Sequence, residues 1–140
     1  MMNILYALLV MIFLFTGFCR ADIYVITHRD NPVKTLSNDQ LRDLYLARSQ
    51  SLPNGEDATI YEGGEADLRA RFILNALGMR ERQFDAYWAR LIFAGRVLPL
   101  KTVDQESELM SHLSNNTHAI GYTDRLPESD SVKTLLVINE

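Results

Sequence analysis

Two adjacent glycines and two nearby arginines form the part of this sequence whose residue types best suit the binding of a small molecule. Gly63 and Gly64 allow the backbone to approach a bound group closely, and the predicted helix that begins here directs unpaired N–H groups and its positive dipole end outward. Arg69 and Arg71 follow in the next turns and could donate a fork of hydrogen bonds to an oxyanion. The chemistry that this stretch suggests is the binding of a small anion.

The same stretch also fits an ordinary turn that binds nothing. Glycines serve tight turns in many proteins, and exposed arginines are commonly solvated. Glu65 and Asp67 fall in the first turn of the predicted helix, where carboxylates satisfy the helix dipole internally and would repel an incoming phosphate. The residues alone leave both interpretations open.

Two further stretches share the position of the glycine turn, directly after a predicted strand. They are Thr27-His28-Arg29 and Gly121-Tyr122-Thr123. In open α/β sheets, ligands bind outside the carboxyl ends of strands, near the amino ends of the helices that follow. We therefore predict a ligand site lined by residues from three strand ends: Thr27, His28, Gly63, Gly64, Arg69 and Tyr122.

Composition and motif content exclude several classes of function. The chain carries 18 acidic and 14 basic residues, and its formal net charge of −4 is not that of a nucleic-acid-binding domain. The 3 histidines lack the spacing of metal ligands, and the acidic residues between 56 and 67 lack the pattern of a calcium loop. The sequence contains no nucleophile elbow, phosphate-binding loop or zinc-protease motif. We therefore expect a protein that is not an enzyme and that holds no metal or cofactor.

An apolar run from Ile4 to Phe18 precedes the polar start of the domain at Asp22. The run is too short to span a bilayer comfortably, which takes about 20 apolar residues, and Cys19 and Ala21 place small side chains where a signal peptidase reads. We predict a cleaved signal peptide over residues 1–21, export to the periplasm, and contact with the membrane through this leader only. An uncleaved N-terminal anchor is the alternative.

Cleavage of the leader would leave one domain of ordinary size, residues 22–140. Cys19 is the only cysteine and would be removed with the leader, so no disulfide, thiolate nucleophile or cysteine metal site would remain. Packing alone must then hold the fold together.

Strand and helix patterns alternate along this domain. Strands are expected at residues 22–28, 58–62, 119–122 and 132–138. Helices are expected behind a capping box of Ser37 and Gln40, from Gly63-Gly64 to Gly78, over residues 80–94, and from a cap at Thr102 or Asp104 to Asn115-Asn116. The third helix supplies aromatic residues that we expect in the core: Phe84, Tyr87, Trp88 and Phe93. This alternation predicts an α/β fold in which helices pack on a mixed or mostly parallel sheet.

The order of these motifs resembles that of a known family. The first half of the domain resembles the phosphate-type substrate-binding proteins of ABC transporters. Four stretches carry this resemblance: Val25-Ile26-Thr27-His28, Asn31-Pro32-Val33, Leu41–Leu46 and Leu52-Pro53-Asn54-Gly55. The second half is similar to short, single-lobe members of that group in Phe72, Leu77-Gly78, Tyr87-Trp88, Phe93-Ala94-Gly95, Pro99 and Ala119-Ile120-Gly121-Tyr122.

The resemblance implies a single lobe of a type-2 periplasmic-binding-protein-like fold. Full members have two such lobes that close on phosphate, with oxyanion contacts from a Ser-Gly-Thr-like turn at a helix start. That turn falls on residues 63–67 here, which contain no serine or threonine. The first hypothesis is a non-enzymatic solute-binding protein for a small anion such as phosphate. The alternative is an accessory module that has lost ligand binding and docks on another protein of the cell envelope.

Overall fold

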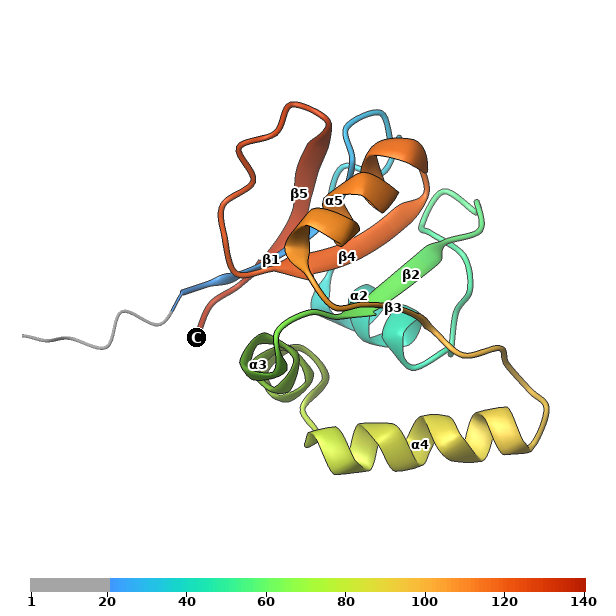
Figure 1. Ribbon diagram of the computed structural model, residues 1–140. Coiled ribbons are helices and arrows are strands. Elements are labelled where there is room, and N and C mark those ends of the chain that lie inside the picture. Colours follow the sequence, from blue (N-terminus) through green and yellow to red (C-terminus); the bar gives the residue numbers. More distant parts are fainter. Residues whose placement is uncertain (1–20) are drawn as a thin grey trace, which may run out of the picture.

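In the computed structural model, which describes residues 21–140, helices and strands alternate as the sequence predicts (Figure 1). The predicted leader lies outside the described residues. The strands are β1 (Ile23–His28), β2 (Thr59–Gly63), β3 (Lys101–Val103), β4 (Ala119–Thr123) and β5 (Val132–Ile138). The helices are α2 (Asn38–Tyr45), α3 (Ala66–Leu77), α4 (Glu81–Phe93) and α5 (Glu106–Asn115).

The strands form one five-stranded sheet in the order β3-β2-β4-β1-β5. β2 pairs in parallel with both β3 and β4, whereas β1 pairs antiparallel with both β4 and β5. Four strands therefore run in one direction and β1 runs in the opposite one. This confirms the predicted mixed, mostly parallel sheet.

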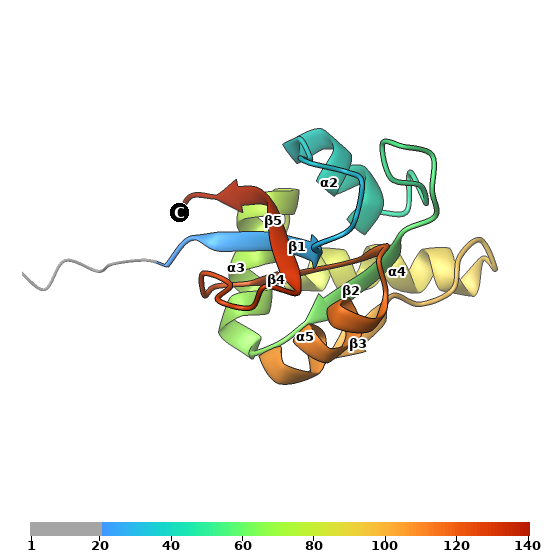
Figure 2. The same ribbon diagram turned by 90° about the horizontal axis from the view of Figure 1, so that it is seen from above.

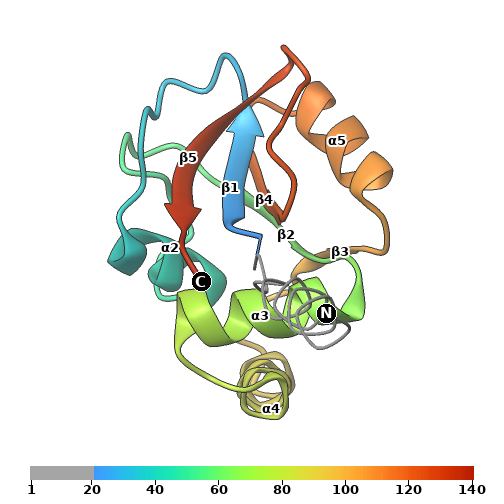
Figure 3. The same cartoon turned by 90° about the vertical axis from the view of Figure 1, so that its left-hand side faces the viewer.

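Helices cover both faces of the sheet, which confirms the predicted α/β architecture. α5 packs on one face, α2 and α3 pack on the other, and α4 lies beyond α3, away from the sheet (Figure 3). The alternation of side chains along a strand produces the two cores. In β1, for example, Val25 belongs to the core under α2 and α3, and Ile26 belongs to the core under α5.

Two predicted helix ends are confirmed by their hydrogen bonds and backbone angles. The N–H of Gln40 donates to Ser37 Oγ at 3.1 Å, and the N–H of Ser37 donates to Gln40 Oε1 at 2.9 Å, which completes the capping box of α2. Gly78 follows α3 with a φ of 69°, the left-handed conformation expected of a glycine at this position.

The predicted start of the last helix is wrong. Its N-cap is Gln105, and Thr102 belongs instead to β3, a strand that the sequence analysis did not predict. β3 has three residues, which is too short for alternation to be visible in a sequence. The strand forms because its backbone pairs with β2.

The predicted burial of Phe93 is also wrong, because its side chain is 96% exposed. Phe84 and Trp88 are buried and lie four residues apart, on the same face of α4. Phe93 follows Trp88 by five residues, which places it on the opposite side of the helix. The aromatic residues of α4 therefore divide between the core and the surface.

Replacing Gly63 by alanine should lower the free energy of unfolding by about 2 kcal/mol or more. Gly63 has a φ of 109°, and a Cβ placed on it would lie 2.5 Å from the carbonyl oxygen of Val103, a backbone atom of β3 that cannot rotate away. The control is Gly55→Ala, because Gly55 has a φ of 86° but open space around it. That control should cost about 1 kcal/mol. Urea unfolding measures both, and equal losses would contradict the clash with β3.

Candidate functional site

The carboxyl ends of β2 and β4 meet the amino ends of α3 and α5 around a small hollow. Its volume is about 40 Å³, and a more open hollow of about 530 Å³ adjoins it on the outer side of α5. The inner hollow is lined by Gly63, Gly64, Glu65, Leu68, Val103, Gln105, Glu106, Leu109 and Tyr122–Arg125. This is the edge at which open α/β sheets bind ligands. We call it the ligand edge.

The backbone N–H groups of the two glycines themselves are engaged within the protein. The N–H of Gly63 donates to the hydroxyl oxygen of Tyr122 at 2.9 Å, and the N–H of Gly64 donates to the carbonyl of Val103 at 2.8 Å. The N–H groups of Gly63 and Gly64 are therefore not available to a ligand. Gly63 and Gly64 shape the turn, and a ligand would have to find its donors elsewhere.

The first turns of α3 and α5 supply such donors. The N-cap residues Glu65 and Gln105 make no side-chain cap hydrogen bond, so their side chains leave the first backbone N–H groups of both helices uncovered. By contrast, Ser37 caps α2 with its hydroxyl group. Two helices without side-chain caps thus begin at the same hollow, with the positive ends of their dipoles directed toward it.

Tyr122 holds the glycine turn in position. Its ring stacks on Phe72 with 3.7 Å between ring centroids and 8° between planes, and its hydroxyl oxygen accepts the hydrogen bond from Gly63. Burial, assisted by the nearby carboxylate of Glu62, raises the pKa of Tyr122 far above its ordinary value. The phenol therefore remains neutral at physiological pH and acts on the site as a positioning group.

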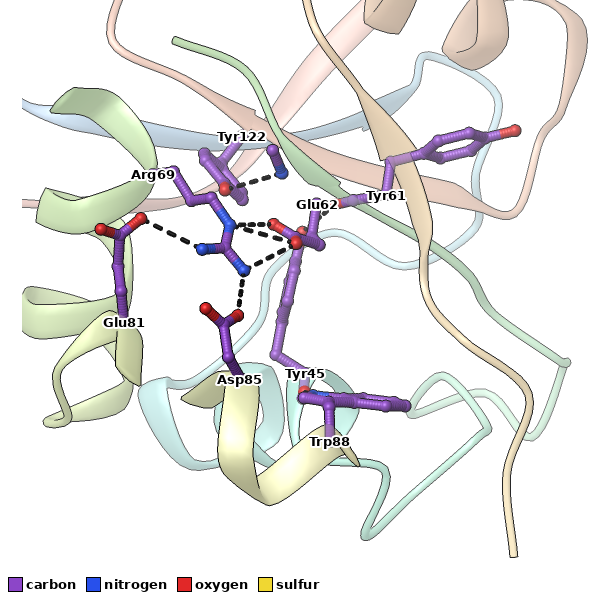
Figure 4. A network of polar contacts seen from close by, with 9 residues as sticks. Tyr45, Tyr61, Glu62, Arg69, Glu81, Asp85, Trp88 and Tyr122 are labelled. Carbon is purple, nitrogen blue, oxygen red and sulfur yellow. Dashed lines mark hydrogen bonds and ion pairs between the residues drawn. The ribbon is translucent and has the colours of Figure 1, made fainter. Parts of the chain in front are cut away.

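Arg69 is turned away from the ligand edge toward α4 (Figure 4). Its Nε donates to Glu62 Oε2 at 2.9 Å and its Nη2 to Glu62 Oε1 at 3.0 Å. The same guanidinium contacts Glu81 at 3.1 Å and Asp85 at 2.8 Å, both on α4. These contacts, the hydrogen bond to Glu62 foremost, raise the pKa of Arg69. Three carboxylates already share this cation, so an oxyanion would have to displace one of them.

Arg71 is engaged in the same way. It contacts Asp67 at 3.0 Å, Asp124 at 3.2 Å and Glu140 at 3.2 Å. The residues that line the hollow include one basic residue, Arg125. Its side chain is largely exposed, and its Nη1 lies 3.6 Å from Glu106 Oε2. The other charged groups around the hollow are carboxylates: Glu65, Glu106 and Asp124. Positive potential at this edge therefore comes mainly from the two helix starts.

Thr27 and His28 lie at the opposite edge of the sheet from Gly63, Gly64 and Tyr122. Because β1 is antiparallel to β4, Thr27 pairs with Ile120, near the beginning of β4. The buried Thr27 hydroxyl donates to the carbonyl of Ala119 at 2.7 Å and accepts from Asn31 at 2.9 Å. His28 Nδ1 accepts from the N–H of Asp30 at 3.0 Å. The six predicted residues therefore do not form one site, since the prediction placed the end of β1 beside the ends of β2 and β4.

The residues that the sequence analysis missed at the ligand edge come from α5 and from the segment after β4. Thr123, the last residue of β4, donates through its Oγ1 to Glu106 Oε1 at 3.0 Å and so links the end of β4 to α5. The sequence analysis did identify Gly121-Tyr122-Thr123 as the end of a predicted strand, although it did not include Thr123 among the site residues. The sequence analysis could not place the start of α5 at the ligand edge, because it did not predict β3. β3 pairs with β2 and so brings Gln105, the N-cap of α5, to this edge.

Within residues 21–140, no cluster of three or more histidine, cysteine or acidic side chains is arranged to hold a metal ion. No helix in this part of the chain is both long and apolar enough to cross a membrane.

The fold is similar to that of solved phosphate receptors. A phosphate ABC transporter substrate-binding protein of Clostridium perfringens, solved with bound phosphate, superposes with a TM-score of 0.63 and 22% identity over 82% of this chain and 45% of that one. An ABC-type phosphate transport receptor of Vibrio cholerae superposes with a TM-score of 0.60 and 18% identity over 84% of this chain and 47% of that one. No family model and no curated protein matches the sequence.

These similarities confirm the resemblance at the level of the fold. The chain spans less than half the length of either receptor. It has the fold of one part of a substrate-binding protein of the phosphate type, the periplasmic-binding-protein-like lobe that the sequence predicts.

Replacing Arg69 by methionine should lower the free energy of unfolding by about 3 kcal/mol, the lower end of the range for breaking a buried ion pair. The loss is large because the substitution leaves the buried carboxylate of Glu62 without a counter-charge. It lies at the lower end of the range because the Arg69 side chain is 20% exposed to solvent. Arg48→Met is the control, because Arg48 is mostly exposed and lies 3.9 Å from Asp43. It should change stability by less than about 1 kcal/mol. Urea unfolding distinguishes the two, and similar small losses would show that Arg69 contributes little.

Proposed function

We propose that this chain is a non-enzymatic solute-binding lobe that holds a small oxyanion such as phosphate at the ligand edge. The proposal rests on one observation: α3 and α5 both begin at the same hollow. Neither helix start is capped by the side chain of its N-cap residue. Backbone N–H groups at a helix start, together with the helix dipole, suit a small anion. The similarity in fold to two phosphate receptors supports the same function.

The carboxylates at this edge restrict which oxyanion fits. Glu65, Glu106 and Asp124 are hydrogen-bond acceptors when ionised, so a ligand beside them should carry a donor of its own. Phosphate retains a protonated oxygen at neutral pH, whereas sulfate does not. We infer that the site prefers phosphate to sulfate.

The same geometry implies weak binding. The inner hollow of about 40 Å³ is far smaller than the roughly 300–1,000 Å³ of ordinary small-molecule pockets, so we expect it to enclose only part of an oxyanion. Arg69 and Arg71 are both engaged with carboxylates, so neither neutralises the ligand. We therefore expect dissociation constants in the millimolar range, about 4 kcal/mol of binding free energy. The predicted leader would place this binding in the periplasm.

Phosphate should raise the melting temperature of the protein more than sulfate does at matched ionic strength. Ligand binding stabilises the folded state by RT ln(1 + [L]/Kd), so the increase should follow the logarithm of phosphate concentration above Kd. Both anions also stabilise proteins nonspecifically, which makes sulfate the necessary comparison. Equal shifts with the two anions would contradict the proposal and would favour the alternative of an accessory module that docks on an envelope protein.

The variant Ala66→Pro should remove the phosphate-specific shift and preserve the fold. Ala66 is the first residue of α3, where proline is well tolerated, and its substitution deletes one N–H group from the helix start that borders the hollow. The preceding residue, Glu65, already has the extended conformation that proline requires, with φ −59° and ψ 143°. The matched control is Asn38→Pro at the first residue of α2, which should retain the shift. A shift that survives Ala66→Pro would place the anion elsewhere.

A further inference from the structure

A continuous segment of this acidic chain, on α4 and after it, carries basic residues but no acidic one. From Ala86 to Val103, three basic residues occur without a single aspartate or glutamate, in a chain of 18 acidic and 14 basic residues. The segment comprises the second half of α4, the turn at Gly95 and the return to β3. This segment therefore carries a net positive charge within a chain whose formal net charge is −4.

The turn between α4 and β3 forms one end of the molecule, as the views from the front and from above both show (Figures 1 and 2). We call residues 90–98 the α4 tip. It carries the two most exposed large apolar side chains of the described residues, Phe93 at 96% and Leu98 at 87%, with the partly exposed Ile92 beside them. Apolar side chains gathered at one end of a soluble domain indicate an interaction surface.

The cations of the α4 tip are free of carboxylate partners. Among residues 21–140, no carboxylate oxygen lies within 4.0 Å of the guanidinium of Arg90 or Arg96. Arg69 and Arg71, by contrast, each contact three carboxylates. The tip thus combines exposed apolar groups with positive charges that are not neutralised within the described chain.

These features determine which partner suits the tip. A second copy of the chain would bring like charges together if the two tips met. Ile92, Arg96 and Leu98 help to line an open hollow of about 770 Å³, but Phe93 lies outside this hollow and is 96% exposed, so its side chain projects from the tip and is not part of a pocket.

We propose that the α4 tip docks on a bilayer with anionic headgroups. Phe93 and Leu98 would enter the boundary between headgroups and acyl chains, and Arg90 and Arg96 would lie among the lipid phosphates. This contact adds to the one expected from the leader and is independent of the ligand edge.

The single tryptophan of the chain allows a test on the full-length protein. Trp88 lies on α4, four residues before Ile92, and should be quenched by vesicles with brominated acyl chains only when the tip approaches the bilayer. The vesicles are phosphatidylcholine alone or an equal mixture with phosphatidylglycerol. The predicted leader, residues 1–21, contains no tryptophan, so quenching reports on Trp88, and the variants at the α4 tip separate the contact of the tip from insertion of the leader. We expect quenching with the mixture, weakened by added salt.

Phe93→Ser and Leu98→Ser should each lower the apparent vesicle affinity by about tenfold or more. Arg90→Gln combined with Arg96→Gln should remove the preference for phosphatidylglycerol. Leu126→Ser is the matched control, because Leu126 is 67% exposed but lies in the loop between β4 and β5, and it should leave quenching unchanged. All these side chains are exposed, so circular dichroism should show an unchanged fold.

Three outcomes would overturn the proposal. Quenching that is equal in neutral and mixed vesicles would exclude recognition of anionic lipid. Vesicle binding without quenching would assign the membrane contact to the leader alone. Self-association in light scattering that is lost in Phe93→Ser, with no quenching in any vesicle, would assign the tip to a contact between copies.

Discussion

The ion pair between Arg69 and Glu62 joins three elements of this fold. Glu62 is on β2, Arg69 is on α3, and the remaining donors of the guanidinium reach Glu81 and Asp85 on α4. α4 packs on α3, and its Trp88 donates a hydrogen bond to the carbonyl of Tyr45 at the end of α2, so this cluster of charges is one of the contacts that decide where α4 lies. A guanidinium can satisfy several carboxylates at once because its donors form a planar fork.

The same ion pair constrains how the ligand edge could bind an anion. An arginine one turn after a helix start is well placed to bind an oxyanion, but Arg69 is committed to Glu62 and faces α4. The attraction that remains at the ligand edge comes from backbone N–H groups and helix dipoles, surrounded by carboxylates. A site of this kind discriminates among anions by hydrogen-bonding pattern more than by charge.

The molecule therefore presents two chemically different ends. The ligand edge combines helix starts with acidic side chains, whereas the α4 tip combines exposed Phe93 and Leu98 with arginines that contact no carboxylate of residues 21–140. Charges of opposite sign at separate ends give the molecule an electrostatic orientation relative to any charged surface. A tip held at an anionic bilayer would keep the acidic ligand edge away from the lipid phosphates, accessible to small solutes.

The sequence by itself determined the succession of helices and strands apart from β3, the capping box at Ser37, the end of α3 at Gly78 and the class of the fold. These features depend on side-chain periodicity and on cap residues within a few positions of one another, so they can be recognised without knowing the rest of the structure. The tertiary structure alone decided the direction of β1, which separates Thr27 and His28 from the ligand edge. It also decided that the hydroxyl oxygen of Tyr122, 59 residues away in the chain, accepts a hydrogen bond from the N–H of Gly63. Such contacts depend on how distant segments pack, and no local pattern encodes them.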